Sequence, residues 1–199
     1  MKKIITIIAA TMVSATAFSQ VEPVDKNKKG VYAGGSLRFG QSFQAGTGSS
    51  GATFGAAGEF GVILPRDSWN RIEIGGEFGT TSLGFKDESG EKVTVDALPV
   101  ALVKFGYGYS LGNHAFGMFR LGAGLGVGEL EQGDFTTDAT ALVGLIGWDA
   151  VFPATDHLDF TVGVDYRMHD VSLDSANGVD FDNIQVNSVN VFASARLKI

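Results

Sequence analysis

Residues 158–170 alternate between two kinds of side chain at every step. Even positions from Leu158 to Met168 are apolar or aromatic, whereas the odd positions are charged, polar or glycine. Only a β-strand has a two-residue period, so one face of this segment is apolar and the other is polar. About twelve residues at roughly 3.3 Å each, tilted by about 40°, span about 30 Å, the thickness of the hydrocarbon layer of a membrane. The pattern therefore predicts one strand of a transmembrane β-barrel.

Seven further segments have the same character, so the chain is predicted to be all-β, an eight-stranded antiparallel up-and-down transmembrane β-barrel. Three predicted connections are short and rich in turn-forming residues, at 65–70, 110–114 and 153–157. Four others, at 40–51, 84–92, 130–137 and 171–185, are predicted to be longer loops. Short turns at one end and long loops at the other are typical of outer-membrane barrels, whose turns face the periplasm. The predicted strands are 31–39, 52–64, 71–83, 93–109, 115–129, 138–152, 158–170 and 186–199.

Alternation alone does not decide which face points outward, because a soluble barrel alternates too, with its apolar face inward. The charged residues favour a membrane barrel. Five of the seven basic residues on the polar faces are arginine, whose planar head suits a crowded, ion-paired interior. Each basic side chain turned to lipid at mid-membrane would be unfavourable by roughly 2 to 4 kcal/mol. The predicted lumen charge network comprises Arg38, Glu59, Arg71, Glu73, Glu77, Lys104, Arg120, Asp149, Asp165, Arg167 and Arg196, with Asp159 and Lys198 on the same faces.

Two segments fit this arrangement poorly. The predicted strand 138–152 has apolar residues on both of its faces. In the fourth predicted strand, Leu98, Val100 and Leu102 would point into the lumen, and Pro99 marks a candidate β-bulge that could reset the register there. The register of both segments stays open at the level of sequence.

Several aromatic residues are predicted to lie on the apolar faces near the turn end of the barrel. Tyrosine and tryptophan collect at membrane interfaces because one end of the ring is apolar and the other is polar. The alternative is that these rings are ordinary core. The predicted membrane-interface aromatics are Tyr107, Tyr109, Phe119, Trp148, Phe152 and Phe160.

The first 29 residues differ in composition from the rest of the chain. Residues 1–19 combine two early lysines, an apolar stretch and the small-x-small sequence Ala17-Phe18-Ser19, which predicts a secretory signal peptide rather than a transmembrane helix. Residues 20–29 are polar and are predicted to be a flexible periplasmic leader. The barrel is predicted to occupy residues 30–199. Cysteine is absent, which excludes a disulfide framework.

The charge of the exported chain is concentrated in the predicted loops. Without the two lysines of the signal peptide, 13 basic and 22 acidic residues give a net charge of −9, which argues against nucleic acid as a partner. Segment 86–92 carries −1, and segments 129–138 and 170–182 carry −4 each. Weak Ca²⁺ or Mg²⁺ binding that bridges these loops to anionic lipopolysaccharide is one hypothesis, and plain solubilising charge is the simpler one. No cofactor and no defined metal site are predicted.

The chain resembles the small eight-stranded outer-membrane barrels, which include the opacity proteins and the membrane domains of OmpA-like and OmpX-like proteins. The resemblance rests on the opening strand Val31-Tyr32-Ala33-Gly34-Gly35, on residues 152–158, on Val164-Asp165-Tyr166-Arg167 and on the C-terminal strand. It implies a location in the outer membrane of a Gram-negative bacterium, contact with outer-membrane lipid and lipopolysaccharide, and insertion by the barrel-assembly machinery. Such barrels usually end in an aromatic residue, whereas this chain keeps the alternation but ends in Ile199.

The function expected from these observations is structural, or one of surface interaction through four extracellular loops that contact host or environmental ligands. Eight strands leave room only for side chains, so a small low-conductance channel is the alternative. A lipid A-modifying enzyme is the second alternative, because outer-membrane deacylases resemble this barrel and use a histidine and a serine two positions apart. The nearest match, His169 and Ser172, is spaced by three, which puts the two side chains on opposite faces of a regular strand. No catalytic residue is therefore predicted.

Overall fold

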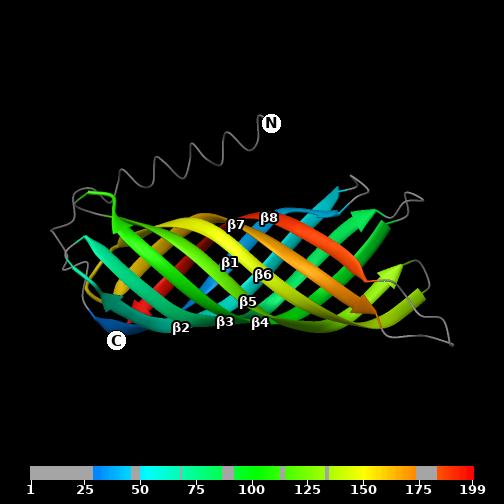
Figure 1. Ribbon diagram of the computed structural model, residues 1–199, viewed down its shortest axis with the longest axis horizontal. Coiled ribbons are helices and arrows are strands. Elements are labelled where there is room, and N and C mark those ends of the chain that lie inside the picture. Colours follow the sequence, from blue (N-terminus) through cyan, green and yellow to red (C-terminus); the bar gives the residue numbers. More distant parts are fainter. Residues whose placement is uncertain are drawn as a thin grey trace.

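The computed structural model describes residues 29–45, 50–67, 69–86, 92–112, 115–132, 135–173 and 183–199. In these residues, eight antiparallel strands form a closed barrel in which each strand pairs with the next and β8 pairs with β1, which confirms the predicted fold. Figure 1 shows the strands crossing the barrel obliquely. No helix among the described residues is long and apolar enough to cross a membrane. The strands are β1 (Gly30–Gln44), β2 (Ser50–Pro65), β3 (Asn70–Lys86), β4 (Lys92–Ser110), β5 (Phe116–Gln132), β6 (Phe135–Pro153), β7 (Leu158–Leu173) and β8 (Ile184–Lys198).

Side-chain hydrogen bonds and a glycine shape the turns at the turn end of the barrel. In the turn between β2 and β3, the Asp67 carboxylate accepts hydrogen bonds of 2.7 Å from the backbone N–H groups of Trp69 and Asn70. The Asn70 side-chain amide also donates to Asp67, and together these bonds hold the pKa of the Asp67 carboxyl below its ordinary value. In the turn between β4 and β5, Gly112 adopts a φ of +98°, a conformation that favours glycine. These residues therefore fix where the hairpins reverse.

The loop end differs from the prediction. The strands extend one to five residues beyond their predicted limits there, so the bounds leave only 45–49, 87–91, 133–134 and 174–183 between them. The prediction that all four loops exceed the turns in length was wrong, because two residues separate β5 from β6. The reason is that polar residues alternate with apolar ones in these segments, and a strand with a polar outer face was mistaken for a loop.

Alternate side chains of each strand point into the barrel and out of it, as predicted. In β7, the charged and polar side chains of Asp159, Asp165, Arg167 and His169 are buried, whereas the apolar side chains between them, such as Val164, are exposed on the outer surface. Many phenylalanine, leucine and valine side chains on the other strands are exposed in the same way. Over the turn half of the barrel, the apolar face is therefore the outer face.

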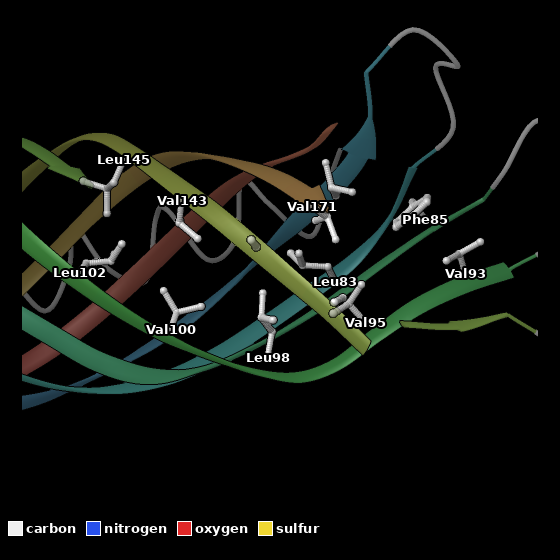
Figure 2. Packing of buried hydrophobic residues seen from close by; sticks show 13 residues of the cluster. Leu83, Phe85, Val93, Val95, Leu98, Val100, Leu102, Val143, Leu145 and Val171 are labelled. Atoms are coloured by element: carbon white, nitrogen blue, oxygen red, sulfur yellow. The ribbon is translucent and has the colours of Figure 1, made fainter. Parts of the chain in front are cut away.

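The loop half of the lumen is filled differently, by a cluster of apolar side chains that we call the apolar plug. Figure 2 shows these side chains pointing from several strands toward the barrel axis. The plug accounts for both segments that fitted the pattern poorly, because β4 and β6 contribute apolar side chains to the lumen at this level. Its members are Leu83, Phe85, Val93, Val95, Leu98, Val100, Leu102, Ala139, Ala141, Val143, Leu145, Val171 and Val186.

The candidate bulge lies in β4. The register of β4 against β5 shifts between Asp96 and Val100, and its register against β3 shifts opposite Thr81 and Leu83. Pro99 lies in this irregular stretch, is exposed on the outer face, and has no amide hydrogen to donate to the β5 ladder. Leu98, Val100 and Leu102 share the inner face with Lys104 by regular alternation. The bulge brings the odd-numbered Val93 and Val95 to that same inner face, and all six side chains are buried.

The outer surface becomes polar toward the loop end, where the interior is largely apolar. Gln41, Lys86, Glu129, Asp138 and Asp170 are all exposed on the outer face near the loop end. The polarity therefore changes along the barrel axis. The turn half has a charged interior and an apolar exterior, as suits lipid. Toward the loop end the interior is largely apolar and the exterior becomes polar, as suits water, although Val127 and Leu142 are still exposed outside the lower part of the plug.

The hairpin of β5 and β6 has the longest uninterrupted ladder among the described strands. Its pairing runs without interruption from Phe116 opposite Val151 to Gln132 opposite Phe135. Strand β5 has 17 residues. At about 3.3 Å per residue and a tilt of about 40°, this length spans roughly 40 Å, about 10 Å more than the hydrocarbon layer. The hairpin therefore extends beyond the part of the barrel whose outer surface is apolar.

Candidate functional site

Glu73 on β3 lies at the centre of the first group of charged side chains in the lumen. Its carboxylate forms ion pairs with Arg71 at 2.7 Å, Arg120 at 3.0 Å and Arg196 at 3.2 Å. Arg120 also donates two hydrogen bonds to Asp149, at 2.5 Å and 2.9 Å. All five side chains are buried. Paired, bidentate contacts of this kind compensate for the removal of charges from water.

Glu59 and Glu77 organise the second group, and Lys104 joins them. Lys104 lies 3.3 Å from Glu59 and 3.1 Å from Glu77. Glu77 also pairs with Arg38 at 2.7 Å and with Arg167 at 3.0 Å. Arg196 links the two groups, because it contacts Glu59 at 3.0 Å as well as the carboxylate at the centre of the first group.

Every strand of the barrel contributes at least one side chain to this network. Asp165 accepts a hydrogen bond from Arg167 at 3.2 Å and another from Asn190 at 2.7 Å, which connects β7 to β8. The structure thus brings together all eleven residues of the predicted network. Lys198 and Asp159, on the same faces, form a separate pair at 2.8 Å near the turn end.

Aromatic and small residues complete the lumen around the charges. The Arg196 guanidinium lies 4.9 Å from the centre of the Tyr32 ring, and Arg71 lies 4.4 Å from the centre of the Phe116 ring. A Cβ added at Gly61 would lie 2.6 Å from the Tyr32 hydroxyl, so a glycine there makes room for the ring. Sequence reasoning missed Tyr32 and Phe116, although both share the inner face of their strands with network residues.

The predicted interface aromatics lie on the outer surface near the turn end. Tyr109 stacks on Phe119 with ring centres 5.9 Å apart and accepts a hydrogen bond of 3.1 Å from the Trp148 indole. Tyr107 donates a hydrogen bond of 3.0 Å to the side-chain oxygen of Asn70 in the adjacent turn. Phe152 and Phe160 face each other across β6 and β7. Their role as a membrane girdle stays a proposal that these contacts support.

The arrangement of the barrel agrees with comparisons with known proteins. The family model described as outer membrane protein beta-barrel domain matches residues 5–192. The chain belongs to this family. Its members reside in the outer membrane of Gram-negative bacteria, so the apolar exterior described above faces lipid. No curated protein sequence matches the chain significantly.

Three solved structures are similar to this barrel. Neisserial surface protein A is 15% identical, with a TM-score of 0.52, and the match covers 86% of this chain and 99% of that chain. Ail of Yersinia pestis, solved with the heparin analogue sucrose octasulfate, is 16% identical over 84% and 99% of the two chains, with a TM-score of 0.46. The outer membrane enzyme PagL is 17% identical over 84% and 98%, with a TM-score of 0.49. At these identities the likeness concerns the fold alone.

His169 and Ser172 occupy opposite faces of β7 in this outer-membrane barrel. Strand β7 pairs with both neighbours without a register shift around these residues. His169 is buried in the lumen, where its Nδ1 lies 3.2 Å from the carbonyl oxygen of Val186. The geometry required for a histidine and serine pair is therefore not formed by these two residues.

Some predictions fall on residues outside the described part of the chain. These include the signal peptide at 1–19, the leader apart from Lys29, and most of the acidic loop residues at 87–91, 133–134 and 174–182. Within the described ranges, no group of three or more histidine, aspartate or glutamate side chains is arranged to hold a metal ion. Cation binding by the loops therefore stays a hypothesis.

Proposed function

We propose that this protein is an outer-membrane barrel with a closed interior that acts at the cell surface through its loop end, rather than by passing solutes. The observation that carries the proposal is that two different fillings block the lumen in series. The charged network fills the turn half, and the apolar plug fills the loop half.

The charged network leaves almost no free space. The cavity among its side chains, lined by residues that include Arg38, Glu77 and Arg120, has a volume of about 10 Å³. A single water molecule needs roughly 10 to 15 Å³ by this measure. A hydrated ion could pass only if several ion pairs separated together, and breaking one buried pair is unfavourable by about 3 to 5 kcal/mol.

The apolar plug adds a second barrier of a different kind. Leu83, Leu98 and Val143 are completely buried within it, together with side chains from five strands. An ion that entered this region would lose its water and gain few polar contacts, because only scattered polar side chains, such as Ser42, Thr81 and His169, are buried at this level. The same packing stiffens the loop end from within, which favours a role in presenting a surface.

The surface at the loop end has the character of an interaction site. Glu129, Asp138 and Asp170 are exposed on the outer wall of the barrel, close to the acidic segments that join the strands. A partner with a basic surface, or lipopolysaccharide bridged by divalent cations, suits this charge. Loops on a rigid scaffold commonly carry such contacts.

Planar-bilayer recordings test the closed interior. We expect no stepwise current from the purified protein, and a reproducible current that persists in the variant Glu73→Gln would favour the low-conductance channel instead. A second arm compares lipid A from cells with and without the protein by mass spectrometry. A change in acyl-chain number would support the enzymatic alternative and contradict the proposal.

The surface role needs its own assay. Cells that display the protein are expected to bind basic test surfaces, such as polylysine-coated beads, more strongly than cells with a variant in which Glu129, Asp138 and Asp170 are changed to the corresponding amides. Equal binding by both strains would contradict the surface role, and equal amounts of folded barrel in the two membranes provide the control.

A further inference from the structure

The outer surface carries a groove that the proposed function does not use. It crosses β7, β8, β1, β2 and β3, and its volume is about 750 Å³. One row of paired residues defines it, because Phe160 pairs with Ala195, Ala195 with Gly35, Gly35 with Gly58, and Gly58 with Phe78. Two phenylalanine rings therefore border a floor of three small residues. Leu37, Ala56, Thr80 and Ala193 line the neighbouring row.

The barrel itself does not require glycine in this floor. A Cβ at Gly35 or at Gly58 would lie 3.7 or 3.8 Å from the nearest atom, which is ordinary contact distance. By contrast, a Cβ at Gly34 or Gly79 would collide with the backbone of the adjacent strand, at Ala195 and Ala56. Packing of the strands therefore explains Gly34 and Gly79 but leaves the hollow over Gly35 and Gly58 unexplained.

The position of the groove indicates what fills it. Phe160 lies two residues from the start of β7, and Phe78 lies eight residues from the start of β3. With about 3.3 Å per residue and a tilt of about 40°, the groove rises from roughly 5 Å to roughly 20 Å above the turn end. Most of this depth lies in the hydrocarbon of the periplasmic leaflet, which is about half of the 30 Å layer, and the Phe78 end reaches just past the middle of the membrane. The groove is continuous with the lipid-facing exterior of this outer-membrane barrel.

We propose that this groove binds one acyl chain of a phospholipid of the periplasmic leaflet as a specific, long-lived ligand. An acyl chain is linear and about as wide as the missing side chains, so it can lie between Phe78 and Phe160 on the floor of small residues. Exposed Lys29 and Arg66, at the turn-side ends of β1 and β2, lie at the level of a phosphate group. The nearby Asp67 carboxylate is engaged within its own turn.

A second copy of the chain fits the groove less well. In a two-fold symmetric dimer the same surface patch is used by both subunits, and two concave floors placed face to face would enclose empty space. Lipopolysaccharide chains enter from the opposite leaflet and would have to reach past the middle of the membrane to meet Phe160. The depth and the shape of the groove thus favour the phospholipid.

Native mass spectrometry of the full-length exported protein tests the proposal. The protein is exchanged into a mild nonionic detergent containing a phosphatidylethanolamine with one palmitoyl and one oleoyl chain, and is then washed with lipid-free detergent. We expect one retained phospholipid per barrel. The variant Ala195→Phe fills the floor of the groove, and we expect it to retain the lipid at least tenfold less.

Matched variants keep the test decisive. Ala123→Phe adds the same ring to an exposed position on β5, outside the groove, and should retain lipid like the unchanged protein. Ala56→Leu makes a smaller change in the neighbouring row if Ala195→Phe does not fold, as judged by heat-modifiable migration on gels. Equal retention by the unchanged protein and both groove variants would overturn the proposal. Retention of lipopolysaccharide by mass, or loss of a dimer only in the groove variants, would overturn it as well.

Discussion

Glu73 on β3 and Arg196 on β8 are 123 residues apart in the sequence, yet Glu73 Oε2 lies 3.2 Å from Arg196 Nη1 inside the barrel. This contact forms only when the last strand has joined the first and the cylinder is closed. The same carboxylate also pairs with Arg71 and Arg120. A single glutamate thus balances three buried guanidinium groups that come from three strands.

Replacing Glu73 with alanine should destabilise the barrel strongly, because three buried arginines would lose a shared counter-charge. We expect the free energy of unfolding in vesicles to fall by about 3 to 5 kcal/mol. Urea titration followed by tryptophan fluorescence measures the change. The control, Glu129→Ala, removes an exposed carboxylate and should alter stability by less than about 0.5 kcal/mol. Similar effects of both variants would show that the network does not stabilise the closed barrel.

Shortening Leu98 to alanine should leave a cavity in the apolar plug. Leu98 is completely buried, and large-to-small changes at such positions lower stability by about 2 to 5 kcal/mol. Leu111→Ala, in the exposed turn between β4 and β5, serves as the matched control and should have little effect. Unfolding is measured as for Glu73. Equal stability of the two variants would contradict a packed interior in the loop half.

A charge placed on the lipid-facing surface should lower the stability of the barrel. Val103 is 70% exposed on the outside of β4, so Val103→Arg would place a guanidinium in the hydrocarbon layer. We expect a loss of roughly 2 to 4 kcal/mol when the protein is unfolded from vesicles. Thr140→Arg, on the polar outer face near the loop end, should be nearly neutral. If both arginines are tolerated equally, the assignment of the lipid-facing surface is wrong.

The Asp67 turn gives a prediction about pH. The folded-state pKa of Asp67 is lowered by hydrogen bonds from Asn70 and Trp69, so the ionised carboxylate stabilises the turn. This contribution is present above the ordinary aspartate pKa and is lost as the pH falls through the lowered value. Asn70→Ala should therefore raise the pKa of Asp67 toward its ordinary value. Carbon-detected NMR titration of the carboxyl carbon measures it, and an unchanged pKa would contradict the role of Asn70.

The alternation of residues such as Val164, Asp165 and Arg167 was enough to predict the strands and the closed barrel. The charged residues that it assigned to the lumen are buried in the structure. The alternation was enough because a strand has only two faces and arginine is strongly disfavoured in lipid. The pairing partners, such as Glu73 with Arg196, could not be predicted, since they depend on the tilt and stagger of strands far apart in the sequence.

The apolar plug and the length of the strands were not predicted, for one shared physical reason. A two-residue period shows which side chains share a face but not which solvent touches that face at a given height. Near Leu83 and Ala139 the barrel leaves the hydrocarbon layer, so its outer face becomes polar and its inner face largely apolar. The same alternation continues with reversed polarity, and composition alone made these strand ends look like loops.

The uninterrupted ladder of β5 and β6 affects how much conformational entropy the protein would lose when a ligand binds to this hairpin. Because the hairpin is paired through Gln132 and Phe135, its backbone shape is set before any encounter. Little conformational entropy then remains to be lost on docking, so even a small contact area could give useful affinity. The β5–β6 hairpin would therefore recognise a ligand with a preformed surface, rather than by folding around the ligand on binding.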